Sequence, residues 1–171
     1  MVNKKNILLK LFPVVIFLIV ATGCGSVQHK ANFQNDYVPQ PDTKIEVGRV
    51  VNETGQTFDV EVEKMLTDAF AEALREENML WTGGEGHKLI LTGKIVEYEK
   101  GDAFKRWLLP GWGSTVLTIQ CDLRNDNQLV GSADARRTVS AGGGYTIGAW
   151  KTIFVSVAKD LVKDLQEQLK E

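Results

Sequence analysis

The sequence is poor in the residues that build reactive or cross-linked sites. Its 171 residues include only two cysteines and two histidines. His29 and His87 have no cysteine or carboxylate at ligand spacing, so the sequence predicts no metal site. It also lacks the G-x-S-x-G turn of serine hydrolases. Lys151-Thr152 stands two residues too far from Gly148 to complete a phosphate-binding P-loop. We therefore expect neither a cofactor nor an enzymatic activity.

Long apolar runs are equally scarce, and the chain has one, at residues 11–21. Lys4, Lys5 and Lys10 precede it or stand at its edge, and no acidic residue comes before Asp36. As a helix this run would be about 16 Å long at 1.5 Å per residue. A bilayer's hydrocarbon core is about 30 Å thick, so the run is too short to span it. Its length and flanks are typical of a signal peptide.

The apolar run ends in Ala21-Thr22-Gly23-Cys24, small residues directly before a cysteine. This ending resembles the bacterial lipobox, although that motif more often has Leu where Ala21 stands. The resemblance implies that residues 1–23 are a signal peptide and that the Cys24 thiol receives a diacylglyceryl group. The new amino group would then be acylated, and more than one acyl chain gives stable anchoring to membrane lipid. An uncleaved anchor with an incidental cysteine is the alternative, which the short apolar run disfavours.

The residue after the lipidated cysteine is Gly25 rather than Asp. In Gram-negative relatives an Asp at this position retains lipoproteins in the inner membrane. In such a host we therefore expect the protein on the periplasmic face of the outer membrane. Lipidation of Cys24 leaves Cys121 as the only other thiol, so no intramolecular disulfide can form even in an oxidising compartment. The fold must be stabilised by its core.

The chain divides into the signal peptide at 1–23, a polar tether at 24–43 and one domain at 44–171. Removal of residues 1–23 takes away three of the 20 basic residues and none of the 22 acidic ones, which leaves a net charge of −5. This charge disfavours nucleic-acid binding. As a flexible coil the tether would span about 25 Å. It contains three apolar residues that could dock on the domain: Phe33, Tyr37 and Val38.

The rest of the chain alternates strand and helix patterns. Strands are predicted at 45–51, 79–82, 88–98, 116–123 and 129–139, with a hairpin turn at 125–127 and Cys121 on the inward face. A helix capped by Thr57 is predicted from Phe58, and a second one follows the glycine-rich residues 141–148. Two apolar helix stripes and a run of antiparallel strands predict an α+β fold. We expect a two-layer sandwich with a mostly antiparallel sheet and both amphipathic helices on one face.

The segment 101–114 joins two strands and is unusually apolar for a loop. Its candidate contact residues are Phe104, Lys105, Arg106, Trp107, Leu108 and Trp112. The interpretation we favour is a lid that closes the open end of the sheet, because apolar residues are usually buried. The alternative is a contact surface for a partner protein or for lipid headgroups, since Trp prefers the membrane interface and cations attract anionic lipids. We expect one tryptophan to point inward and the other outward.

From Ile45 onward the chain resembles a family of small bacterial lipoproteins whose domain is of unknown function (number forty-four ten). The resemblance covers most of residues 44–169. It rests on the first strand and helix, the glycine run before the last helix, and three short sequences: G-D-A-F-K-R at 101–106, P-G-W-G at 110–113 and L-R-N-D-N-Q-L-V at 123–130. Asn127 stands where relatives often have a glycine. The family implies an envelope lipoprotein but no established reaction.

These observations together favour a lipid-anchored, non-enzymatic envelope module that binds a protein partner or helps an assembly. The alternative is a carrier of a small amphipathic ligand held between sheet and helices. A pocket beneath the 101–114 loop would favour the carrier, and an exposed apolar patch there would favour the binding module.

Lipidation of Cys24 can be tested by metabolic labelling with palmitate. The label should appear on the mature protein and should be lost in Cys24→Ala, because that change removes the acceptor thiol. Equal labelling of both proteins would show that Cys24 is not the lipidated residue.

Overall fold

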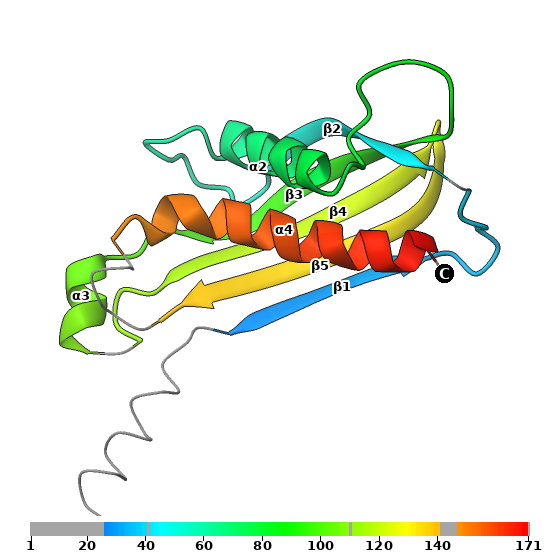
Figure 1. Cartoon of the computed structure of the whole chain (residues 1–171). Helices are drawn as coiled ribbons and strands as arrows, with labels where there is room; N and C mark the ends of the chain where they lie inside the picture. Colours follow the sequence, from blue (N-terminus) through cyan, green and yellow to red (C-terminus); the bar gives the residue numbers. More distant parts are fainter. Residues whose placement is uncertain (1–25, 41, 110, 141–146, 171) are drawn as a thin grey trace, which may run out of the picture.

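The computed structural model describes residues 26–40, 42–109, 111–140 and 147–170. The expected signal peptide, Cys24 and most of the glycine-rich run lie outside these residues. Within the described part, five strands form one sheet in the order β1-β5-β4-β3-β2 (Figure 1). The strands are β1 (Val27–Phe33), β2 (Lys44–Asn52), β3 (Lys88–Glu99), β4 (Thr115–Asn125) and β5 (Gln128–Val139).

The sheet is mostly antiparallel, as the sequence predicts. β3, β4 and β5 are antiparallel neighbours, and β1 adds to the outer edge of β5. β2 and β3 are the parallel pair. A parallel pair needs a crossover connection, which helix α2 (Val62–Glu76) supplies between the two strands. Asp126, at a positive φ of 52°, makes the tight turn between β4 and β5.

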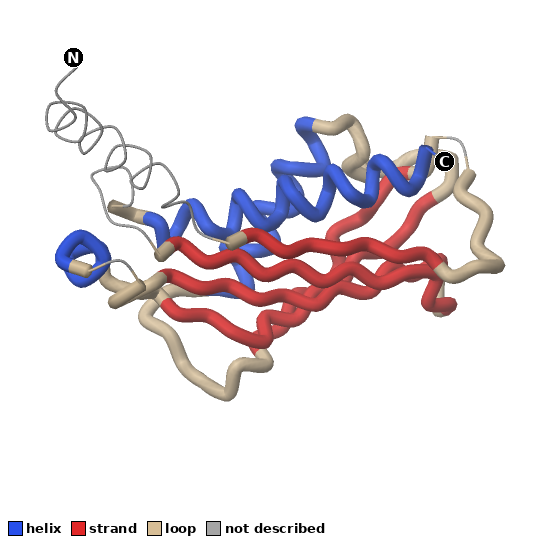
Figure 2. Tube along the Cα trace, turned by 90° about the horizontal axis from the view of Figure 1, so that it is seen from below, coloured by secondary structure: helices blue, strands red, loops and turns tan. Residues whose placement is uncertain are grey.

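Helices α2 and α4 (Ala149–Lys170) cover one face of the sheet (Figures 1 and 2). α4 lies over β1, β4 and β5, while α2 lies over β2 and packs against α4. Each helix buries the stripe that its apolar spacing predicts. None of the described helices has the length and apolar character needed to cross a membrane. The α+β two-layer sandwich with both helices on one face is confirmed.

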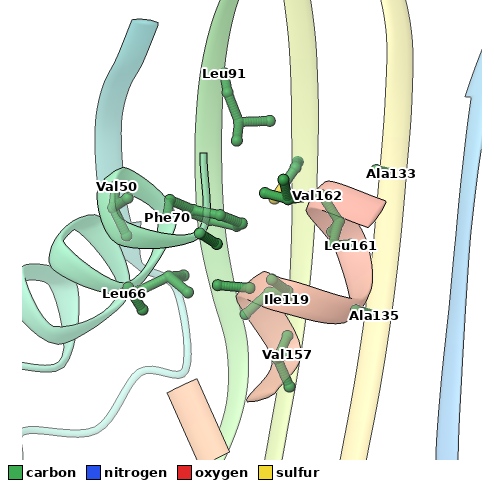
Figure 3. Close-up of a cluster of buried hydrophobic side chains, with 14 of the residues drawn as sticks. Val50, Leu66, Phe70, Leu91, Ile119, Ala133, Ala135, Val157, Leu161 and Val162 are labelled. Atoms are coloured by element: carbon green, nitrogen blue, oxygen red, sulfur yellow. The ribbon is translucent and has the colours of Figure 1, made fainter. Parts of the chain in front are cut away.

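The core lies between the helices and the covered face of the sheet (Figure 3). Leu66 and Phe70 of α2 and Val157 and Leu161 of α4 all belong to this buried cluster. Cys121 of β4 belongs to this cluster and is buried, as its alternation with leucines and isoleucine predicts. Burial raises the pKa of the Cys121 thiol, so the group is a small apolar core residue rather than a nucleophile.

The expected flexible tether at 24–43 is wrong for its middle part. Residues 27–33 form β1, an edge strand paired with β5 over seven residues. Ala31 is buried opposite Ala133, and His29 lies 2.5 Å from Asp164 of α4. The polar composition of this strand is that of an edge strand with one solvated face. The folded domain therefore begins before residue 44.

Two of the three apolar residues of that segment do dock on the domain. Phe33 and Tyr37 stack with their ring centroids 5.2 Å apart and pack against the core. Val38 stays exposed. Both ends of the segment are thus tied to the sheet, one by strand pairing and the other by aromatic packing.

Helix α2 begins at Val62, four residues later than predicted, and its cap is Glu61 with no side-chain hydrogen bond rather than Thr57. Tertiary contacts explain the shift. Phe58 packs edge-on against Tyr98, with 5.0 Å between ring centroids, and Asp59 pairs with Lys100 at 2.6 Å. These contacts hold Phe58 and Asp59 outside the helix. The short strand predicted at 79–82 is reduced to a single bridge between Ile45 and Leu80.

Tyr98 provides a pH test of the core. It is 2% exposed, its hydroxyl donates a hydrogen bond to the Trp150 carbonyl at 3.1 Å, and burial raises its pKa to about 12. In the unfolded chain the Tyr98 hydroxyl ionises near pH 10, whereas in the folded protein it stays protonated up to about pH 12. The free energy of unfolding should therefore fall as pH rises from about 10 to about 12.

The Tyr98→Phe variant is the matched control for this titration. It should lose about 1 kcal/mol at neutral pH through the missing hydrogen bond. Denaturant unfolding at a series of pH values should then show a shallower alkaline fall than in the parent. An equal fall in both proteins would show that Tyr98 is not the group responsible.

Candidate contact surface

The segment 101–114, expected as a loop, contains a short helix, α3 (Ala103–Leu108), at one end of the sheet. Asp102 caps it: its Oδ1 accepts hydrogen bonds from the backbone N–H groups of Phe104 at 2.9 Å and Lys105 at 3.0 Å. These backbone hydrogen bonds lower the pKa of Asp102, with a smaller contribution from nearby cations. The cap fixes where the helix starts.

Arg106 fastens α3 to the rest of the domain. It is only 2% exposed. Its Nη1 donates hydrogen bonds to the Gly113 carbonyl and to Thr115 Oγ1, both at 2.8 Å. The Thr115 hydroxyl in turn donates to the Lys100 carbonyl at 2.9 Å. Burial lowers the pKa of Arg106 and the charge of Asp102 opposes this. The guanidinium thus bridges the two chain segments that enter and leave α3.

Two glycines, Gly101 and Gly113, let the chain segments that enter and leave α3 lie close together. The Asp102 amide donates to the Gly113 carbonyl at 2.8 Å. Gly101 and Gly113 have φ values of +67° and +70°, and a Cβ on either would approach neighbouring atoms to 2.5 Å and 2.7 Å. No other residue fits both the backbone conformation and the space. The segment therefore leaves and rejoins the sheet through a narrow, defined base.

Five large apolar side chains of the segment are exposed to solvent. We call these five residues the α3 patch, and their exposed fractions are Phe104 64%, Trp107 66%, Leu108 51%, Leu109 61% and Trp112 51%. Within the patch the rings of Phe104 and Trp107 stack with centroids 6.0 Å apart. The ammonium group of Lys105 lies 5.7 Å from the Trp112 ring centroid.

The structure overturns the lid interpretation of this segment. Trp107 and Trp112 are both exposed, so neither closes the core, and the expectation that they point opposite ways is also wrong. Arg106, a candidate contact cation in the sequence, is instead the buried fastener of α3. The physical reason is that the Arg106 hydrogen bonds use the inward face of the helix, which leaves the apolar face outside. The exposed apolar patch of the alternative interpretation is present.

A signal for this arrangement is present in the sequence. Phe104, Trp107 and Leu108 stand at i, i+3 and i+4, the spacing of one helix face, and Asp102 is a residue type that caps helices. Arg106 falls on the other face of the same helix. The burial of Arg106 could not be read from the sequence, because its partners are a backbone carbonyl and a threonine hydroxyl.

The sheet face opposite the helices is polar. Glu97 there pairs with Arg136 at 3.0 Å and accepts a hydrogen bond from Thr118 at 2.5 Å. Gln120 is exposed nearby on β4. Shallow hollows lie over this face, one of them lined by Arg49, Val51, Thr92, Gly93, Lys94, Gln120 and Asp122. We call this surface the open face.

The described residues contain no group of three or more His, Cys, Asp or Glu side chains that could hold a metal ion. His29 contacts Asp164, and His87 is exposed before β3, where its carbonyl accepts a hydrogen bond from the Lys44 amide. The two histidines therefore lie in separate parts of the fold.

The fold and the α3 patch define a two-layer α+β domain with an apolar surface mounted at one end. Residues 35–143 match the family model described as "Domain of unknown function (DUF4410)". The match spans more than half of the chain, so the protein belongs to that family. The resemblance drawn from the sequence is confirmed to this extent. The comparison with curated proteins found no match.

Two solved structures of PelC share the fold. The PelC dodecamer from Paraburkholderia phytofirmans is 15% identical with a TM-score of 0.58, and the match covers 82% of this chain and 98% of PelC. A leucine-to-methionine variant of the same PelC dodecamer is 17% identical with a TM-score of 0.56, over 83% and 97% of the two chains. Protein XCC0632 from Xanthomonas campestris, of family DUF330, is 12% identical with a TM-score of 0.48, over 81% and 98%.

The roles of the α3 residues can be separated by stability measurements. Arg106→Ala should lower the free energy of unfolding by about 3–6 kcal/mol, because it removes two hydrogen bonds from a charged donor, each worth about 1.5–3 kcal/mol. The neighbouring exposed change Lys105→Ala is the matched control and should stay within about 0.5 kcal/mol of the parent.

Trp107→Ala and Trp112→Ala should likewise melt within a few degrees of the parent, since neither ring is buried. Loss of several kcal/mol from either tryptophan variant would restore the lid interpretation.

Proposed function

We propose that the protein is a lipid-anchored lipoprotein of the bacterial cell envelope that acts as a non-enzymatic binding and assembly module. The lipobox-like ending at Cys24 supports the anchor. Membership of the DUF4410 family is consistent with this assignment but carries no known reaction.

The observation that carries the proposal is the α3 patch. Five neighbouring apolar residues are held outside the core on a base fixed by Arg106 and two constrained glycines. Leaving so many large apolar side chains in water is unfavourable, at about 25 cal/mol per Å² of apolar surface that could have been buried. Exposed apolar patches of this kind mark interaction sites. The Asp102 cap and the Arg106 hydrogen bonds hold this patch at the end of the sheet.

Assembly is the second part of the proposal. The fold is shared with PelC, whose structure is a dodecamer. We infer that this chain also works beside other protein chains, either copies of itself or a second envelope protein. The open face is the surface we assign to them, because no described helix covers it and its ion pairs and hydroxyls suit a polar, reversible interface.

The ligand-carrier alternative predicts a pocket beneath the 101–114 segment. Five hollows on the described residues are lined by other parts of the chain. We therefore place the binding module first.

The assembly proposal can be tested by photo-crosslinking in cells. A photoreactive amino acid in place of Gln120 probes the open face, and one in place of Glu72 on the exposed side of α2 is the matched control. The Gln120 position should yield a discrete crosslinked product, identified by mass spectrometry as an envelope protein or a second copy, and Glu72 should yield none. Absence of product from Gln120, with the detergent-solubilised protein monomeric by light scattering, would contradict the assembly role.

A further inference from the structure

Exposed apolar side chains are concentrated at one end of the described domain. Nine large apolar residues are exposed in the described part of the chain, and seven of them lie at the end of the sheet where α3 stands. Five form the α3 patch. The others are Val27 at the start of β1 and Ile147 just before α4, whose first turn contacts the end of β3 through Tyr98 and Trp150. The remaining two of the nine, Val38 and Val155, lie elsewhere.

The chain leads toward Cys24 from this same end. β1 starts at Val27, beside the last residues of β5, and the Thr138 amide donates to the Ser26 carbonyl at 2.9 Å. Two residues after Thr138, just past the end of β5, the Ser140 carbonyl accepts a hydrogen bond from the Gly111 amide of the α3 segment at 2.8 Å. The start of β1 and the α3 segment are thus both hydrogen-bonded to the chain at the end of β5, and Figure 1 shows both at the same end of the sheet.

Chain length then limits how far the anchor can be from the α3 patch. Cys24 is two residues before Ser26. Consecutive Cα atoms are about 3.8 Å apart, so the Cα of Cys24 is within about 7.6 Å of the Cα of Ser26. A lipid on Cys24 therefore holds a membrane surface close to the end of the sheet that presents the apolar side chains, because β1 begins only three residues after Cys24.

The composition of the α3 patch fits that surface. Tryptophan concentrates at the boundary between headgroups and acyl chains, where its ring is partly apolar and its N–H stays hydrated. Phenylalanine and leucine on the same helix face bury into the outer acyl region, as in helices that lie in the membrane plane. Lys105, exposed beside Trp112, adds a cation at the level of anionic headgroups.

We propose that the α3 patch inserts into the interface of the membrane that holds the acyl chains of Cys24, as a second contact that fixes the domain end-on. This inference rests on the proposed lipid anchor and adds a lipid contact to it. The Arg106 hydrogen bonds fasten α3 to the start of β4, so insertion sets the orientation of the whole sheet. The long axis of the strands then points away from the membrane, and the open face stands to the side, where another protein chain can reach it.

The test uses the mature, lipidated protein in vesicles of phosphatidylethanolamine and phosphatidylglycerol. Three single-tryptophan variants keep Trp107, Trp112 or Trp81, with the other tryptophans changed to Phe. Trp81 is the matched control, because it lies at the opposite end of the sheet, where its amide donates a hydrogen bond to the Ile45 carbonyl near the start of β2. Lipids brominated on their acyl chains should quench the emission of Trp107 and Trp112 at least twofold and leave that of Trp81 unchanged.

A further variant separates insertion from anchoring. Phe104→Ser with Leu108→Ser, made in the chain that keeps only Trp112, should reduce the quenching of Trp112 while the protein still floats with the vesicles on its acyl chains. Both changed side chains are exposed, so circular dichroism should show an unchanged melting transition.

Other outcomes overturn the inference in distinguishable ways. Flotation without quenching of Trp107 or Trp112 would leave the anchor standing and refute the lipid contact. A blue-shifted emission that brominated lipid does not quench would place the patch against a protein, either a partner or a second copy. Failure to float, together with absence of palmitate label, would refute the anchor itself and with it this inference.

Discussion

The burial of a single sheet face under α2 and α4 is the constraint on which the rest of the structure depends. The core must hold the fold without a disulfide, because Cys121 is itself part of that core. Its side chains come from both helices and from all five strands. Because both helices lie on one face, no described helix covers the opposite face. The open face carries charged and hydroxyl groups that suit contact with water, whereas the α3 end exposes apolar side chains.

The α3 end shows how a polar group can decide where apolar side chains go. A six-residue helix has one face to pack, and here that face is used by the Arg106 guanidinium and its oxygen acceptors. Had an apolar residue stood at position 106, the same helix could have turned Trp107 or Phe104 toward the core. The burial of one cation and the exposure of several apolar residues are therefore two consequences of one arrangement. Gly101 and Gly113 make it sterically feasible by letting the two chain segments approach.

Much of the fold could be predicted because its signals are local. The alternation of β4 places Cys121 inside, and the helix stripes place both helices on one face. The errors have a different origin. β1 pairs through its backbone, and its mostly polar side chains give no alternating pattern, so the sequence predicts a tether there. The predicted start of α2 is too early because Phe58 and Asp59 make contacts with the distant residues Tyr98 and Lys100.

The residues of the candidate site could be predicted from the sequence, but not whether their side chains face the core or the solvent. The cluster of aromatic, apolar and basic residues at 104–112 is evident in the sequence, and so are the two ways of using it. Choosing between them required the position of Arg106, whose partners are nine residues or fewer away in sequence yet belong to the other arm of the segment. A hydrogen bond to a backbone carbonyl leaves no pattern of residue types to detect.

The pairing of β1 changes what an anchor at Cys24 would do. A free coil of twenty residues would let the domain sample a shell about 25 Å deep above the lipid. Strand pairing from Val27 onward removes that freedom and leaves only Gly25 between Ser26 and Cys24, the residue expected to carry the acyl chains. With such an anchor the domain would stay at the membrane surface. Its orientation there would be decided by the part of the adjoining end that contacts the lipid. His29 and Asp164 tie the same strand to α4, so a constraint applied at the anchor is transmitted to the core rather than absorbed by a flexible linker.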